Sequence, residues 1–411
     1  MQGSLRRRGP AGGWEYVIDV GTQRAQRCQL CGKRFWVNRR PKGSCPSCGG
    51  ELSEADERRR QTKDGFATRK ACQAAMSKAL VAVEQRTFVL PTHVTVREFL
   101  LDEWLAAIKG TLRLTTHASY SSLCECHIIP RLGAVHLQKL VPSQINGLYA
   151  YLLAEGRVCG QGGLSPSSVR RVHAVLHRAC RDAVRWGRLT VNPANAADPP
   201  KASAEYDELV VWSAGQLAAF LASVCSDRLF ALWRLLAMTG MRRGEALGLR
   251  WDDLDMEAGQ LSIRRALVPV NGVARICEPK TKRGRRTMAL DPETLAALAA
   301  HAARQADERS QSGEAWLEAG YVFVRANGEA LQPYAVSKAF RQHVRAACLP
   351  TIRLHDLRHT YATLALATGI NPRIVSGGLG HSTVAFTVDI YSHVLPQQDQ
   401  EAAELIAGLL V

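Results

Sequence analysis

The sequence predicts a multidomain protein that is mainly α-helical with a small β component, and three observations carry this prediction. First, 411 residues exceed what one hydrophobic core usually organises, so about two or three domains are expected. Second, apolar residues recur at helical spacing over most of the chain. Third, runs of aromatic and β-branched residues bounded by turn residues occur in only two short regions. The expected domains cover residues 1–90, 91–200 and 201–411.

The charge of the chain indicates a polyanionic partner. The net charge is +16 and the pI is about 9.6. Residues 1–90 hold 18 Lys and Arg against 8 Asp and Glu, so most of the excess lies in the first domain. Nucleic acid is the first candidate, and solubility alone is the simpler alternative. Since no apolar run could span a membrane and the start lacks a secretion signal, we expect a cytoplasmic protein.

The first domain has the pattern of a small α+β module. Residues 14–20 are typical of a strand, and the basic run 58–63 suits a second strand before a turn at Asp64-Gly65. Thr68 is a suitable N-cap for a helix over 69–84. A module of this size is difficult to stabilise without a cross-link.

Two Cys-x-x-Cys pairs, separated by 13 residues, interrupt this module. Four thiolates at this spacing suit a tetrahedral Zn²⁺, and Gly32 and Gly49 allow a tight turn after each pair. Because four protein ligands leave no open coordination position, we expect structural and not catalytic zinc. A redox pair and a chance spacing are the alternatives. The expected ligands are Cys28, Cys31, Cys45 and Cys48.

The second domain is expected to be an all-helical bundle. The predicted helices cover residues 94–105, 115–128 (ending before Pro130), 141–153 and 165–185. Ser165 suits the N-cap of the last helix, with Pro166 in its first turn. The Pro- and Ala-rich stretch 195–201 is expected to be a linker. The last helix carries arginines that suit either phosphate contacts or a solvated face: Arg170, Arg171, Arg178, Arg181 and Arg185.

The third domain is expected to combine helices with a short β segment. Helices are predicted over 216–224, 229–239, 292–305, 333–348 and 355–368. Strands are predicted over 260–264, 275–278 and 286–290, with turns at Asn271-Gly272 and Arg283-Gly284.

Four short motifs follow one another in this domain. They are Thr239-Gly240-Met241-Arg242-Arg243-Gly244-Glu245-Ala246-Leu247, Pro279-Lys280-Thr281-Lys282, His355-Asp356-Leu357-Arg358-His359-Thr360, and Leu379-Gly380-His381 with Asp389-Ile390-Tyr391-Ser392-His393. In this order and spacing they resemble the catalytic domain of the tyrosine recombinase (phage integrase) family, over about 213–396. The resemblance implies an integrase that cleaves and rejoins DNA through a 3′-phosphotyrosine intermediate, to integrate or excise a mobile element. It also implies an arm-type DNA-binding first domain and a SAM-like core-binding second domain.

The chemistry explains why these residue types belong together. Transfer of a phosphodiester to a protein nucleophile places extra negative charge on the transition state, which two guanidiniums can hold. A phenol has a pKa near ~10 and needs a base at neutral pH. The arginines can do the work of a divalent ion, so no catalytic metal is expected. No ATP is expected either, because the phosphotyrosine bond conserves the free energy of the phosphodiester.

The family roles carry over onto matching positions. Arg242 and Arg358 match the two arginines, His355 the base, Lys280 the acid on a β-hairpin, His381 the residue that binds the scissile phosphate, and Tyr391 the nucleophile. Glu245 is expected to support Arg242. Lys282 remains an alternative to Lys280, and Tyr361 is the nearest rival of Tyr391. One departure is Ser376-Gly377-Gly378, where the family often has a charged or polar pair; it is expected to loosen the helix before His381.

The resemblance also implies the partners. These are double-stranded DNA with attachment sites, a homotetramer on that DNA, a DNA-bending accessory protein and a directionality factor. The tail 397–411 has the spacing of a helix that docks either on its own domain or on a neighbouring protomer. A chromosome-dimer resolvase, a type IB topoisomerase and a zinc-ribbon regulator with an inactive recombinase domain are the rival functions. The last would lack a catalytic residue, and no position is missing.

Overall fold

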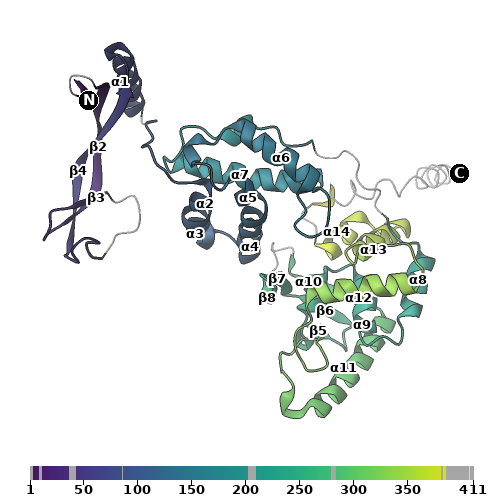
Figure 1. Cartoon of the computed structure of the whole chain (residues 1–411). Coiled ribbons are helices and arrows are strands. Elements are labelled where there is room, and N and C mark those ends of the chain that lie inside the picture. Colours follow the sequence, from purple (N-terminus) through teal and green to yellow (C-terminus); the bar gives the residue numbers. More distant parts are fainter. Residues whose placement is uncertain are drawn as a thin grey trace. The chain divides into compact units, whose positions relative to one another are not determined.

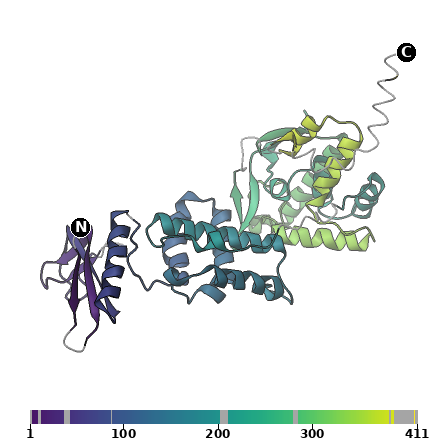
Figure 2. The ribbon, with the colours of Figure 1, turned by 90° about the horizontal axis from the view of Figure 1, so that it is seen from above.

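The computed structural model describes residues 3–8, 12–36, 43–85, 87–201, 210–278, 284–380, 383–385 and 407. The chain divides into two compact units, Met1–Ser203 and Ala204–Val411 (Figures 1 and 2). The first unit contains an N-terminal module and a helical bundle, each with its own cluster of buried apolar residues. The division at 90 and 200 stays a prediction. No helix in the described ranges is long and apolar enough to cross a membrane.

The N-terminal module is an antiparallel sheet with one helix packed against it. Strand β2 (Trp14–Cys28) pairs with β4 (Leu52–Phe66) along its length, and with β1 (Gly3–Arg7) and β3 (Arg34–Trp36) on its other edge. β2 and β4 have 15 residues each and extend well beyond the predicted segments. They form a ribbon, and α1 packs against the strands near one end of it (Figure 1).

Helix α1 (Arg69–Glu84) begins as predicted. The Thr68 side chain accepts a hydrogen bond from the backbone N–H of Ala71. The helix buries Cys72 against Tyr16 and Ile18 of β2. This small cluster lies at the α1 end, so the far end of the ribbon is left without an apolar core of its own among the described residues.

The helical bundle matches the predicted order of helices. Its α-helices are α2 (Val96–Glu98), α3 (Leu105–Ile108), α4 (Leu114–Leu123), α5 (Ile129–Leu132), α6 (Pro142–Glu155) and α7 (Pro166–Arg185). Helical turns of the π type at Phe99–Trp104 and Cys124–Ile128 join α2 to α3 and α4 to α5. In the core, Trp104 donates a 3.0 Å hydrogen bond to the buried Asp182. The predicted N-cap Ser165 accepts from the Ser168 N–H.

Two predictions about the bundle were wrong. The helix expected to stop before Pro130 continues to Leu132, because a wider π turn directly precedes the proline and relieves the clash of its ring with the preceding turn. The stretch expected to be a linker packs on the bundle instead. Ala197 is buried there, and the Asp198 N–H donates to the Asn146 side-chain oxygen at 2.8 Å.

The second unit mixes helices with short sheets, as predicted. Its helices are α8 (Ala214–Ser223), α9 (Phe230–Thr239), α10 (Arg243–Leu247), α11 (Pro292–Ser312), α12 (Pro333–Ala346), α13 (Asp356–Ala367) and α14 (Pro372–Leu379). Its strands are β5 (Leu254–Asp255), β6 (Gln260–Ile263), β7 (Ala266–Val270), β8 (Val273–Cys277) and β9 (Arg286–Ala289). The order β5-β6-β9 makes one antiparallel sheet, and β7-β8 makes a hairpin. Its turn is the predicted Asn271-Gly272, both with positive φ.

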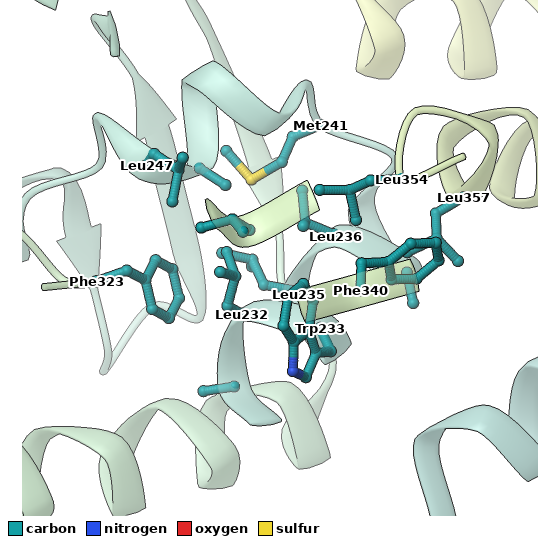
Figure 3. Packing of buried hydrophobic residues seen from close by; sticks show 14 of the residues in the cluster. Leu232, Trp233, Leu235, Leu236, Met241, Leu247, Phe323, Phe340, Leu354 and Leu357 are labelled. Carbon is teal, nitrogen blue, oxygen red and sulfur yellow. The ribbon is translucent and has the colours of Figure 1, made fainter. Parts of the chain in front are cut away.

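Helix α9 runs through the middle of the core of this unit. Leu232, Trp233 and Leu235 are fully buried, and the Trp233 ring lies 6.0 Å from that of Phe340 on α12. Figure 3 shows these side chains packed with Met241 and Leu247, which follow α9 in the chain. Because α9 is buried along most of its length, the residues at its C-terminal end are held in place by the core.

Candidate active site

The first motif begins where α9 ends, at a glycine that no other residue could replace without strain. Gly240 has φ +59°, in the left-handed region. A Cβ at this position would lie 2.5 Å from the Tyr361 ring and 2.9 Å from the Leu379 side chain. The Gly240 carbonyl accepts a 2.9 Å hydrogen bond from Arg358. The tight turn therefore brings the first and third motifs into contact.

Arg242 follows as the N-cap residue of α10, and Glu245 binds it twice. The Arg242 backbone N–H donates to Glu245 Oε2 and its Nη1 donates to Oε1, both at 2.9 Å. Glu245 is buried, whereas the Arg242 side chain is 42% exposed. The geometry supports the predicted role of Glu245 as the residue that orients Arg242.

A second arginine, which the sequence reasoning missed, completes this arrangement. Arg286 on β9 donates to both Glu245 oxygens, at 3.0 and 3.3 Å, and to the Gly378 carbonyl of α14. Burial by itself raises the pKa of Glu245, but the hydrogen bond and charge of Arg286, with those of Arg242, lower it below its usual value. The carboxylate is therefore ionised between two guanidiniums. One signal could have indicated a partner such as Arg286: a glutamate within an apolar motif, once buried, needs cations beside it.

The third motif lies at the start of α13. Asp356 is buried and accepts from the Arg353 backbone N–H at 2.7 Å and from its guanidinium at 2.9 and 3.0 Å. Arg358 is also buried, and its Nη2 donates to the Leu379 carbonyl at 2.6 Å. Helix α13 thus presents Arg358 towards the end of α14.

His355 precedes α13 as its N-cap residue, in a cationic setting. Burial lowers the pKa of His355 to about 4, and the charges of His359, Arg358 and Arg242 act in the same direction, against the opposing effect of Asp356. The imidazole is consequently neutral at pH 7 and able to accept a proton. The His359 ring lies 5.4 Å away, edge to face.

The two predicted arginines, Arg242 and Arg358, both donate hydrogen bonds to the backbone directly before His381. Arg242 Nη2 donates to the Gly380 carbonyl at 3.3 Å, and Arg358 binds the neighbouring Leu379 carbonyl. Helix α14 is regular through Ser376-Gly377-Gly378, so the expected loosening was wrong: the Arg286 bond to Gly378 holds this turn.

The structure brings together Arg242, Glu245, His355 and Arg358. The other predicted catalytic residues, Lys280, His381 and Tyr391, lie outside the described residues, as do the alternative Lys282 and all of the tail 397–411 except residue 407. Tyr361, the rival nucleophile, is half-buried against Leu379 and Val375, and burial raises its pKa. A raised pKa makes its phenolate harder to form, which argues against this rival.

An open groove of about 440 Å³ contains the exposed part of the site. Arg242 and His355 line it together with cationic and polar residues of α10 and α12, and with the segment before α13. The lining residues are Arg242, Arg243, Gly244, Ser337, Arg341, Arg353, Leu354 and His355. Such a groove suits an anionic ligand.

The four cysteines of the N-terminal module gather at the far end of the β2–β4 ribbon. All four sulfur atoms lie within 4.8 Å of one another, with Cys28–Cys48 at 3.4 Å and Cys31–Cys45 at 3.7 Å. A tetrahedral site with Zn–S bonds of about 2.3 Å requires sulfur separations of about 3.8 Å. Gly32 and Gly49 both have positive φ, as expected for the turn after each pair. These sulfurs could hold a metal ion.

The arginines of α7 divide into two groups. Arg178, Arg181 and Arg185 surround the buried Asp182, at 4.0, 3.9 and 3.3 Å. Arg170 donates to the Pro200 carbonyl, and Arg171 is exposed. Part of the predicted basic face therefore serves the bundle itself.

Comparisons with known proteins agree with this architecture. The phage integrase family matches residues 214–398, and the phage integrase N-terminal SAM-like domain matches residues 95–153. The "Tyrosine recombinase XerC-like" protein of Caldanaerobacter subterraneus subsp. tengcongensis is 31% identical over 268 residues, which cover 61% of this chain and 68% of the relative.

Two solved structures share the fold. One is the Tn1549 transposon integrase in complex with a circular intermediate DNA, with a TM-score of 0.62, 22% identity, and coverage of 76% of this chain and 99% of that one. The other is a lambda integrase tetramer bound to a Holliday junction, with a TM-score of 0.51, 17% identity, and coverage of 93% and 94%.

Proposed function

Because this chain belongs to the phage integrase family of tyrosine recombinases, and is thus a site-specific DNA recombinase, we propose that Tyr391 is its nucleophile and that Arg242, Arg358, His355, Lys280 and His381 complete the catalytic set. One observation carries this proposal. Arg242 and Arg358 both bind the carbonyls of the two residues before His381, so the first, third and fourth motifs converge on one point.

In the first step, the Tyr391 oxygen attacks the scissile phosphorus and forms a 3′-phosphotyrosine bond. The bond from phosphorus to the 5′-oxygen breaks, and Lys280 supplies the proton of that leaving group. Arg242 and Arg358 stabilise the charge on the non-bridging oxygens, and His381 donates to one of them.

His355 accepts the phenol proton of Tyr391 in this scheme. Burial and the neighbouring cations lower its pKa to about 4, which keeps the imidazole neutral and able to accept a proton at pH 7. The negative charge of a bound phosphate would raise this pKa towards neutral pH, where a base is most effective. Glu245 and Arg286 act through Arg242 and touch no DNA. In the reverse step, a 5′-hydroxyl attacks the phosphotyrosine and releases Tyr391, so the phosphodiester energy is conserved without ATP.

Trapped cleavage tests the proposal. A duplex that contains an attachment site and carries a nick beside the cleavage position loses its short fragment after cleavage, so the covalent complex accumulates on a denaturing gel. We expect a labelled protein band with 5′-labelled upstream strand for the wild type and none for Tyr391→Phe. Tyr361→Phe is the matched control and should retain the band. A band from Tyr391→Phe, or a 5′-phosphate linkage, would contradict the assignment.

A second assay separates the function from a type IB topoisomerase. Relaxation of a supercoiled plasmid without an attachment site would indicate the topoisomerase, whereas a recombinase should act only when the site is present.

The four cysteines are proposed to hold a structural Zn²⁺. The sulfur separations near 3.4–3.7 Å support this ligand set, and a Cβ at Gly50 would approach the Cys28 sulfur to 3.0 Å, so the site is closely packed. Metal analysis of the purified protein should find about one zinc per chain. Cys45→Ser should lose it, and Cys126→Ser, which changes an exposed cysteine of the bundle, should not.

The quaternary and domain assignments are also proposed. Residues 1–90 would bind arm-type sites, residues 91–200 would bind core DNA, and residues 201–411 would cleave it, with four protomers on two attachment sites. The tetramer of the lambda integrase on a Holliday junction supports this stoichiometry. Mass measurement of the complex trapped on two sites should give four protomers, and a mass of two would contradict it.

A further inference from the structure

The groove beside Arg242 and His355 is wider than the scissile phosphate requires. It extends from these two residues to Arg243 on α10 and to Ser337 and Arg341 on α12. A single phosphate held by Arg242 and Arg358 leaves the α12 side of the groove without a role in the proposed reaction.

Arg243 is anchored on this side of the groove. Its Nη1 donates to the Pro333 carbonyl at 3.0 Å and to the Ser337 hydroxyl at 2.6 Å. Both acceptors are neutral, and no carboxylate in the described ranges pairs with Arg243. Burial lowers its pKa, as expected for a cation held partly away from water without a counter-ion. The guanidinium therefore carries an uncompensated charge in a defined position.

The neighbouring cations of the groove differ from Arg243 in this respect. The Arg353 guanidinium donates to both oxygens of the Asp356 carboxylate, and Arg242 pairs with Glu245. Arg341 resembles Arg243 in that no described carboxylate pairs with it. Unlike Arg243, it is exposed and donates only one long hydrogen bond, to the Ser337 carbonyl at 3.4 Å. Two unneutralised guanidiniums thus lie together at one end of the groove, where they attract an anion.

We propose that Arg243, assisted by Arg341, binds a backbone phosphate of the cleaved strand adjacent to the scissile one. The inference rests on the proposed function, because it is that reaction which brings a DNA strand into the groove. A phosphodiester fits the chemistry: it carries one negative charge, it accepts several hydrogen bonds, and it recurs next to the scissile phosphate whatever the base sequence. The second phosphate fixes the direction of the strand, so that the scissile phosphorus lies in line with the nucleophile.

Neutral linkages in the DNA test this without changing the protein. Two trapped-cleavage substrates are prepared. Each carries a single methylphosphonate, at one or the other of the two linkages that flank the scissile phosphate. The wild type should lose about tenfold or more in cleavage rate at one of these linkages, where a charge-assisted contact is lost. Arg243→Gln should show that loss on all-phosphate DNA and no additional loss at that linkage.

Two further variants test the inference even if Arg243→Gln disturbs folding, since Arg243 is half-buried. Arg341→Gln changes an exposed side chain. In this variant, the methylphosphonate at the sensitive linkage should cause a smaller loss of cleavage rate than in the wild type. Arg345→Gln is the matched control on α12: it removes the same charge outside the groove and should leave the effect of the linkage unchanged.

Each outcome decides the question. If the losses from Arg243→Gln and from the methylphosphonate simply multiply, or if no linkage beside the scissile phosphate matters, the inference is wrong while the recombinase function stands. If wild type forms no covalent complex on all-phosphate DNA, the proposed function itself fails.

Discussion

The N-terminal module and the catalytic unit hold their functional residues in opposite ways. In the module, the buried apolar residues Tyr16, Ile18 and Cys72 lie at the α1 end, and the cysteine cluster lies at the far end of a ribbon of two 15-residue strands. In the catalytic unit, the site lies directly on a large core through α9. The first region needs a local cross-link because it has too little apolar area to bury, whereas the second needs ion pairs that orient side chains on an already rigid support.

Metal removal should have the largest effect and should separate the two regions. If the four cysteines hold the proposed zinc, a strong chelator is expected to unfold the cysteine end of the ribbon, because metal binding would supply its folding energy. The rate of amide hydrogen exchange should rise by about 10²-fold or more over 25–36 and 43–54, because these residues lose nearly all their protection. The rate in α9 should stay unchanged. Zinc should restore protection and Mg²⁺ should not. Equal exchange with and without the chelator would mean that the ribbon is stable by itself.

The turn at Gly240 is the next most sensitive point. Gly240→Ala should destabilise the catalytic unit by about 2–4 kcal/mol, because a Cβ there meets the Tyr361 ring and the backbone is left-handed. Displacement of the Arg358 acceptor should lower cleavage by about 10²-fold. Urea unfolding and trapped cleavage measure both effects.

Gly369→Ala provides the control for backbone strain alone. Gly369 has φ +79° and nothing within 4 Å of an added Cβ. This variant should cost about 1 kcal/mol and leave cleavage nearly intact. Equal losses from the two variants would show that crowding at Gly240 is unimportant.

The pH dependence of stability should report the setting of His355. Its pKa is lowered by burial to about 4 in the folded protein, while the unfolded chain binds the proton near pH 6.5. The unfolded state therefore gains a proton first, and stability should fall as pH drops from about 6.5 towards 4, by up to about 3 kcal/mol. In His355→Gln, the free energy of unfolding measured with urea should depend less on pH between pH 6.5 and 5. An unchanged slope in this variant would contradict the lowered pKa.

Helix caps provide the smallest and most closely matched comparison. Thr68 caps α1 in the module and Ser213 caps α8 in the catalytic unit. Replacement of either by Ala should cost about 1 kcal/mol. The melting temperature should fall by roughly 4–8 °C for the small module and by roughly 2–4 °C for the larger unit. Calorimetry of the full chain resolves the two transitions, and equal shifts would mean that they unfold as one.

Features that depend on a few consecutive residues were predicted correctly. The Thr68 cap, the Ser165-Pro166 helix start and the Asn271-Gly272 turn each follow from local backbone and hydrogen-bond rules. The strand lengths of the ribbon, the helix through Pro130 and the packing of Ala197 on the bundle were missed. These depend on partners distant in the chain, which no local pattern specifies.

The same distinction applies to the site. The order of the four motifs identified Arg242, Glu245, His355 and Arg358 from the sequence, and the structure brings them together. Arg286 was missed because its partners, Glu245 and Gly378, are 41 and 92 residues away.

The sequence by itself determined the types of residue, their order and the excess of positive charge. Only the tertiary structure decided which of two adjacent arginines serves the site. Arg285 pairs with the exposed Glu278, whereas Arg286 is buried against Glu245. The two are chemically equal in the sequence, but successive side chains along extended backbone point to opposite faces, and the register of β9 with β6 directs Arg286 inward.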